Sequence, residues 1–252
     1  MKVIDAHCHL PKNKSVEELI HLMDKSRVEK ALLILNTKED QDALWDQIDL
    51  LLRYKARLGI AVGYDIRIPD IDEYYQRLRD LGIPCMLKLH SRIMRYTLED
   101  IPDILSRMKN ISFSTVMVDG FDHGHHLENL ICLELLVAVA ERFADRRIVF
   151  AHAGGINILK TMLCTRTLKN VYYDFSLTVP YLFNTSIHQD MLHFLRYNHE
   201  KVMFGSDYPD FTVDVSLEKF HILFQELGFE DDLIKNILYQ NALNIYSDVF
   251  LE

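Results

Sequence analysis

The stretch Val3-Ile4-Asp5-Ala6-His7-Cys8-His9-Leu10 opens the chain with an apolar run that ends in alternating polar side chains. This pattern is typical of a short β-strand. Because side chains on a strand alternate between two faces, we expect Asp5, His7 and His9 on one face, with Ala6, Cys8 and Leu10 in apolar packing on the other. Two imidazoles on one face can bind a single metal ion at roughly 2.0–2.1 Å each. Taken alone, the spacing also fits two histidines at an ordinary strand end.

The strand signal recurs along the chain, and each strand is followed by a longer amphipathic segment that is typical of a helix. The expected strands after the first are 30–35, 58–62, 85–90, 115–119, 147–152, 171–175 and 201–205. The expected helices include one opened by a capping box at 15–18, then 41–57, 71–81, 98–108, 127–143, 156–164, 186–196, a helix capped by Ser216 that ends at Leu227, and 231–246.

Eight strand–helix pairs in this order favour parallel strands joined by right-handed crossovers. In a chain of 252 residues, they predict an α/β fold, the (β/α)8 TIM barrel, as a single domain over residues 1–252. An open doubly wound sheet is the alternative, but the first strand is not followed by the glycine-rich phosphate turn of that fold.

Composition limits the partners that we expect. The formal net charge is −9 and no stripe of Lys and Arg occurs, which argues against a nucleic-acid partner. The 4 cysteines are scattered without a Cys-x-x-Cys pair, as in an intracellular protein with reduced thiols. Neither a signal peptide nor an apolar run of about 18 residues is present, so we expect no membrane partner. We therefore expect a cytoplasmic protein with a small-molecule substrate, and its apolar helices are compatible with a homodimer.

Polar side chains stand at the ends of several expected strands. Since the active site of a (β/α)8 barrel lies at the carboxyl ends of its strands, these side chains are expected to face one another. Imidazole and carboxylate groups at so many strand ends indicate a metal-binding or acid–base site. The groups are His7 and His9 on the first strand, Lys88 and His90 on the fourth, Asp119 on the fifth, His152 on the sixth and Asp207 after the eighth.

The same residues resemble the amidohydrolase superfamily, in particular its amidohydrolase-2 branch of metal-dependent hydrolases and related decarboxylases. The resemblance rests on Asp5-Ala6-His7-Cys8-His9, on His152-Ala153-Gly154-Gly155, on Gly205-Ser206-Asp207-Tyr208-Pro209, and on a final helix-like stretch at 236–243. It therefore extends over essentially the whole chain. It implies one divalent metal ion, zinc before manganese, with His7, His9 and Asp207 as ligands. It also implies that Asp207 and His152 are the catalytic groups.

The implied activity is hydrolysis of an amide, lactone or ester bond in a small, anionic molecule by a metal-activated water. A bound metal lowers the pKa of water toward about 7, and a neighbouring carboxylate can accept the proton. A non-oxidative decarboxylase on the same scaffold would need the same ligands. A catalytically silent barrel that binds a ligand is the third alternative.

The fifth strand departs from the family pattern, because Asp119 stands where a histidine ligand is common. Either Asp119 takes over as a metal ligand, or the loop histidines His123, His125 and His126 supply an imidazole; the same histidines could also be solvated. Lys88, His90, Arg92 and His123 are expected to bind substrate. Arg92 and Arg95 suggest an anionic substrate group, since guanidinium matches carboxylate and phosphate, although solvated loop charges fit equally well. Asp174 shares a face of the seventh strand with Tyr172 and could line the barrel, although a polar strand end bonded to a neighbouring loop is slightly favoured.

Overall fold

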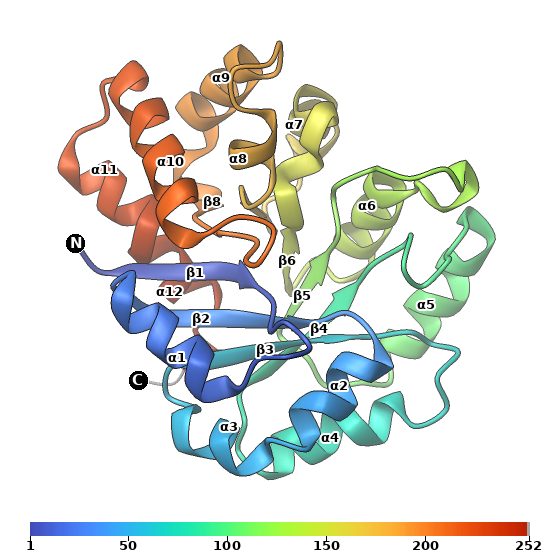
Figure 1. Cartoon of the computed structure of the whole chain (residues 1–252). Coiled ribbons are helices and arrows are strands. Elements are labelled where there is room, and N and C mark those ends of the chain that lie inside the picture. Colours follow the sequence, from blue (N-terminus) through green and yellow to red (C-terminus); the bar gives the residue numbers. More distant parts are fainter. Residues whose placement is uncertain (251–252) are drawn as a thin grey trace.

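Eight parallel strands pair in sequence order, from β1 to β8, in a computed structural model that describes residues 1–250 (Figure 1). This confirms the (β/α)8 barrel. The strands are β1 (Val3–Cys8), β2 (Val28–Leu35), β3 (Leu58–Gly63), β4 (Cys85–Leu89), β5 (Thr115–Val118), β6 (Arg147–Phe150), β7 (Val171–Asp174) and β8 (Val202–Met203).

Backbone hydrogen bonds from the segment after β8 join it to β1 and bring the two ends of the sheet together. The amide of Ala6 donates to the carbonyl of Phe204 at 2.9 Å, and the amide of Asp207 donates to the carbonyl of His7 at 2.9 Å. The amide of His9 donates to the carbonyl of Tyr208 at 2.7 Å. These bonds place Asp207 directly beside the two histidines of β1.

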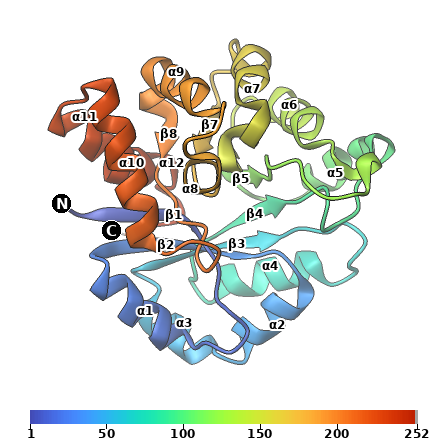
Figure 2. The same cartoon turned by 45° about the horizontal axis from the view of Figure 1, so that its top comes forward.

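The helices encircle the strands (Figure 2), and no helix within residues 1–250 is long and apolar enough to cross a membrane. They are α1 (Val16–Lys25), α2 (Lys38–Trp45), α3 (Ile48–Tyr54), α4 (Ile71–Asp80), α5 (Ile101–Met108), α6 (Cys132–Arg142), α7 (Ile158–Thr165), α8 (Thr178–Leu182), α9 (His188–Asn198), α10 (Val213–Leu227), α11 (Asp231–Lys235) and α12 (Asn241–Ile245).

Two helix boundaries differ from expectation for local reasons. The expected helix 41–57 is broken between α2 and α3, where the side-chain oxygen of Gln47 leaves the helix to accept a hydrogen bond from the amide of Val16 at 2.9 Å. Ser216 does not cap α10. Thr212 does, by accepting from the amide of Val215, while the Ser216 hydroxyl donates to the carbonyl of Ser206 at 3.2 Å.

The strands carry two separate apolar layers. The inner layer fills the barrel and is completed by residues from the end of the chain, including Tyr246, Val249 and Phe250. Met86 and Met117 belong to this inner layer, and Lys88 and Asp119 are the next residues on the same faces of their strands. The polar site therefore lies directly above an apolar core.

The alternation expected along the first strand is wrong after Asp5, because the pairing of β1 with β2 shifts between Asp5 and Cys8. Ala6 lies in the inner layer, whereas Cys8 packs in the outer layer. A bulge of this kind turns successive side chains away from the simple two-face pattern. Asp5 is turned toward the segment after β8, where it accepts hydrogen bonds from the amide of Ser206 at 2.8 Å and from its hydroxyl at 2.5 Å.

Candidate metal centre

Imidazole and carboxylate groups from the end of β1 and from the segments after β6 and β8 converge at the carboxyl ends of the strands. His7 Nε2 lies 3.4 Å from Asp207 Oδ1, and His9 Nε2 lies 3.5 Å from the same oxygen. One ligand atom from each of His7, His152 and Asp207 lies within 4.8 Å of the others. Nitrogen and oxygen donors at these separations fit a single divalent metal such as zinc or manganese. Their individual roles as ligands stay predictions.

Two of these residues have a strained backbone. His152 has a φ of 58° and Asp207 a φ of 57°, in the left-handed region that non-glycine residues seldom adopt. Such strain persists where the surrounding structure holds the residue in place, and it is concentrated at functional sites. Strand β6 ends at Phe150, before the expected boundary, so His152 lies in the segment Ala151–Asn157, in which residues 152–155 all have positive φ.

Residues at and just after the end of β7 form hydrogen bonds with the Nδ1 atoms of His7 and His152. Asp174 Oδ2 lies 3.0 Å from His7 Nδ1. The carbonyl and the hydroxyl oxygens of Ser176 each lie 3.0 Å from His152 Nδ1. Sequence reasoning missed Ser176, and it slightly favoured an ordinary strand end over a barrel-lining role for Asp174. The available signal was the run of polar residues at every second position, Asp174, Ser176 and Thr178, directly after an apolar strand.

Asp119 is the centre of a second cluster, deeper in the barrel. Its Oδ2 lies 3.3 Å from Lys88 Nζ, 3.6 Å from His90 Nε2 and 3.5 Å from His152 Nε2. Burial alone would raise the pKa of Asp119, but the basic groups around it hold that pKa well below its usual range. Lys88 is fully buried and paired with this carboxylate. Metal binding by Asp119 and substrate binding by Lys88 stay predictions.

The charges of the metal-binding cluster are set by burial and by neighbours. Burial and the positive charge of Lys88 lower the pKa of His7 to about 4, so its ring is neutral at pH 7. Burial raises the pKa of Asp207, but the hydrogen bond from His9 and the charge of His152 outweigh it and keep the carboxylate ionised. Burial lowers the pKa of His152, yet Asp119 and Asp207 together raise it to about 9. The metal-free site therefore holds one neutral imidazole, one carboxylate and one imidazolium.

The remaining residues expected to bind substrate lie after β4 and β5. His90 Nδ1 and Arg92 Nε are both buried, and neither has a hydrogen-bond partner within residues 1–250. The loop after β5 covers Arg92, since a Cβ on Gly124 would lie 3.3 Å from Arg92 Cδ. His123 is exposed and its Nδ1 contacts the carbonyl of Phe121 at 2.8 Å, so it stays outside the cluster. His125 and His126 are exposed as well.

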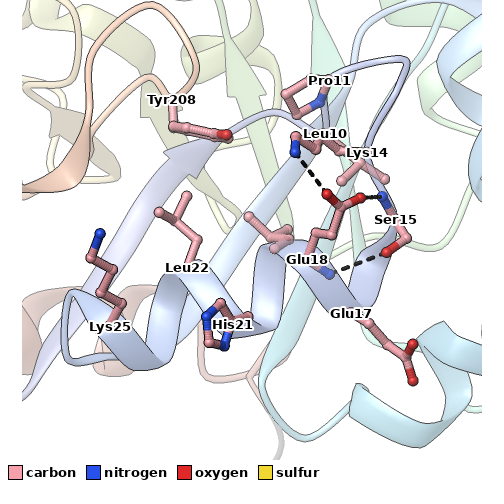
Figure 3. Close-up of a pocket in the computed structure, with 11 residues that line it drawn as sticks. Leu10, Pro11, Lys14, Ser15, Glu17, Glu18, His21, Leu22, Lys25 and Tyr208 are labelled. Carbon is pink, nitrogen blue, oxygen red and sulfur yellow. Dashed lines mark hydrogen bonds and ion pairs between the residues drawn. The ribbon is translucent and has the colours of Figure 1, made fainter.

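A surface cavity of about 490 Å³ lies between α1 and Tyr208, away from the imidazoles (Figure 3). Lys14 and Glu18 form an ion pair at 2.7 Å on its wall, and Glu18 also completes the capping box of α1 with Ser15. These polar groups satisfy one another. A smaller cavity of about 170 Å³ lies beside His9, on the other side of the loop that contains Pro11.

A sequence model of the amidohydrolase family matches residues 40–247. This chain belongs to the amidohydrolase family. The matched range contains His152 and Asp207 and begins after the two histidines of β1. No curated protein sequence matches the chain.

Solved structures share the barrel of this amidohydrolase at low sequence identity. An uncharacterized TIM-barrel protein from Bordetella bronchiseptica is 15% identical, with a TM-score of 0.72 over 99% of each chain. The 5-carboxyvanillate decarboxylase LigW from Sphingomonas paucimobilis is 13% identical, with a TM-score of 0.63 over 98% of this chain and 99% of its own. N-isopropylammelide isopropylaminohydrolase from Burkholderia multivorans is 10% identical, with a TM-score of 0.58 over 96% of this chain and 73% of its own. At these identities the likeness supports the fold alone.

Proposed function

We propose that this chain is a metal-dependent hydrolase that acts on an amide, lactone or ester bond of a small anionic molecule. The observation that carries the proposal is the convergence of imidazole nitrogens with one ionised carboxylate at the carboxyl ends of the strands. We assign His7, His9 and Asp207 to holding a divalent metal, zinc or manganese. When bound, such a metal lowers the pKa of a coordinated water toward about 7 and so supplies hydroxide at neutral pH.

The protein's own groups handle protons and orient the substrate. Asp207 is ionised, so it can accept a proton from the attacking water and pass it to the leaving group. His152 keeps its proton because Asp119 lies 3.5 Å from its Nε2. Its two N–H groups face Asp119 and Ser176, so the imidazolium acts through its positive charge, which can stabilise the negative charge that develops on the oxygen of the bond that is cleaved.

The anionic character of the substrate is inferred from an unpaired donor. Arg92 Nε is buried without a partner among the described residues, and an unmet buried donor costs about 1–3 kcal/mol. A substrate carboxylate or phosphate at this position would satisfy the guanidinium, which binds such groups in a bidentate manner. Arg92→Lys keeps the charge but loses the fork, so it should raise KM for anionic substrates more than it lowers kcat.

A decarboxylase is the second candidate, supported by the fold shared with the decarboxylase LigW and by the same unpaired donor of Arg92. The protein, loaded with zinc or with manganese, is to be assayed on lactones, esters, amides and aromatic carboxylates. Acid release without CO2 would support hydrolysis, and CO2 release would replace it with decarboxylation. The matched control is the double variant His7→Ala/His9→Ala, which should lose either activity with its metal.

Metal content separates both enzymes from a catalytically silent barrel. Protein purified without chelator should contain on the order of one equivalent of a divalent transition metal. A content far below one equivalent, with no uptake of added zinc or manganese, would overturn both proposals. The small-molecule partner, the homodimer and the cytoplasmic location stay predictions.

A further inference from the structure

Three polar residues lie at alternate positions from the end of β7 onward. They are Asp174, Ser176 and Thr178, and we call them the β7 cradle. All three are buried with no exposed surface. The cradle contacts residues from two other parts of the barrel, His7 on β1 and His152 after β6. Neither imidazole has a hydrogen-bond partner at its Nδ1 atom from any other described element.

The first contact determines which nitrogen of His7 carries the proton. Asp174 Oδ1 accepts from the amide and the hydroxyl of Ser176 and from the amide of His152, and a carboxylate with donors on all sides is an acceptor at both of its oxygens. His7 Nδ1, at 3.0 Å from Asp174 Oδ2, must therefore be the donor. The lone pair of the neutral ring is then on Nε2, the atom that faces Asp207 at 3.4 Å.

The second contact holds His152 at its ring and at its backbone. The carbonyl of Ser176 can only accept, so His152 Nδ1 donates to it at 3.0 Å and Nε2 is left facing the site. The amide of His152 donates to Asp174 Oδ1 at 3.4 Å, and its carbonyl accepts from the hydroxyl of Thr178. Both backbone groups of a residue with positive φ are thus bound by the cradle.

We infer that the β7 cradle orients the two imidazoles of the site, with Asp174 as the positioning residue for His7 and with Ser176 and Thr178 as positioning residues for His152. The inference deepens the proposed function and rests on it for the use of the two Nε2 atoms. If the β7 cradle were only structural, its polar groups would form hydrogen bonds with one another. Replacement of Asp174 would then leave the proton of His7 on the same nitrogen.

Asp174→Asn is the decisive variant because the surroundings dictate how the amide must lie. Oδ1 of Asp174 accepts from the amide and hydroxyl of Ser176 and from the amide of His152. The asparagine oxygen must take that position, which turns its NH2 toward His7 Nδ1. That nitrogen must then accept, so the proton of His7 moves to Nε2, as the loss of an orienting carboxylate does in other histidine sites.

The measurement is ¹⁵N NMR of the histidine rings in metal-free protein, together with zinc affinity by competition with a chelator. In the native protein His7 should be protonated at Nδ1. In Asp174→Asn it should be protonated at Nε2, and zinc should bind 10- to 100-fold more weakly. Tyr173→Phe is the control for a change in β7, since the Tyr173 hydroxyl contacts Thr165 and not the site.

The outcomes separate this inference from the proposed function. A native His7 protonated at Nε2 would overturn the inference even if Asp174→Asn failed to fold. Zinc affinity of folded Asp174→Asn within threefold of native would overturn it as well. Native protein that binds neither zinc nor manganese but shows His7 protonated at Nδ1 would leave the orienting role standing and would refute the hydrolase.

Discussion

Replacement of Lys88 by methionine should destabilise the protein more than its place near a substrate site would suggest. The side chains of Lys88 and Asp119 are 1% and 4% exposed, and their charged atoms lie 3.3 Å apart. Removing one partner of a buried pair costs about 3–5 kcal/mol. In Lys88→Met the carboxylate keeps its contacts with His90 and His152, so we expect the lower end, about 3 kcal/mol. In Asp119→Asn the buried ammonium loses the one carboxylate that it contacts among the described residues and keeps only neutral acceptors, so we expect about 5 kcal/mol.

Thermal unfolding of metal-free protein at pH 7.5, followed by near-UV circular dichroism, measures these costs. At about 2–4 °C per kcal/mol, Tm should fall by about 6–12 °C in Lys88→Met and by about 10–20 °C in Asp119→Asn. The double variant should cost no more than Asp119→Asn alone, because the neutral pair leaves no charge unpaired. Lys14→Met removes a shorter but exposed ion pair and should leave Tm unchanged. Costs of the two single variants that add within 0.5 kcal/mol in the double variant would refute the buried pair as a unit.

Three further predictions follow from single observations. Burial lowers the pKa of His90 from 6.5 to about 3, so the unfolded chain binds this proton at a higher pH than the folded protein does. The free energy of unfolding should therefore fall as the pH is lowered from 6.5 to 3. Between pH 7.5 and pH 5, the loss should be about 2 kcal/mol larger in native protein than in His90→Asn. In Gly63→Ala the new Cβ would lie 2.5 Å from the backbone oxygen of Asn36, so urea unfolding should show a free energy of unfolding that is lower by about 3 kcal/mol. In Gly228→Ala the new Cβ meets no atom within 4 Å, so the loss should be about 1 kcal/mol. Zinc at 100 times its Kd should stabilise native protein by about 2.7 kcal/mol, measured as a rise of Tm in calorimetry. No rise in native protein, or an equal rise in His7→Ala/His9→Ala, would contradict the proposed metal site.

Local patterns were sufficient for the barrel and for most of the residues that meet at its rim. Strand and helix periodicities depend on neighbours along the chain, and eight of each in alternation leave few topologies. Once the barrel is assumed, the carboxyl ends of its strands must converge. His7, His9, His152 and Asp207 could therefore be expected to lie together, and they do.

The sequence by itself determined the strand–helix order and the chemical groups at the strand ends, because both depend on local pattern. Only the tertiary structure decided how those groups are paired. The bulge after Asp5 and the burial of Lys88 against Asp119 arise from the pairing of neighbouring strands, and the contact of Asp174 with a histidine 167 positions away arises from closure of the ring. Closure depends on the register and packing of all eight strands at once, and no short stretch of sequence contains that information. The orientation of the two imidazoles, on which the proposed chemistry depends, is thus a property of the closed barrel.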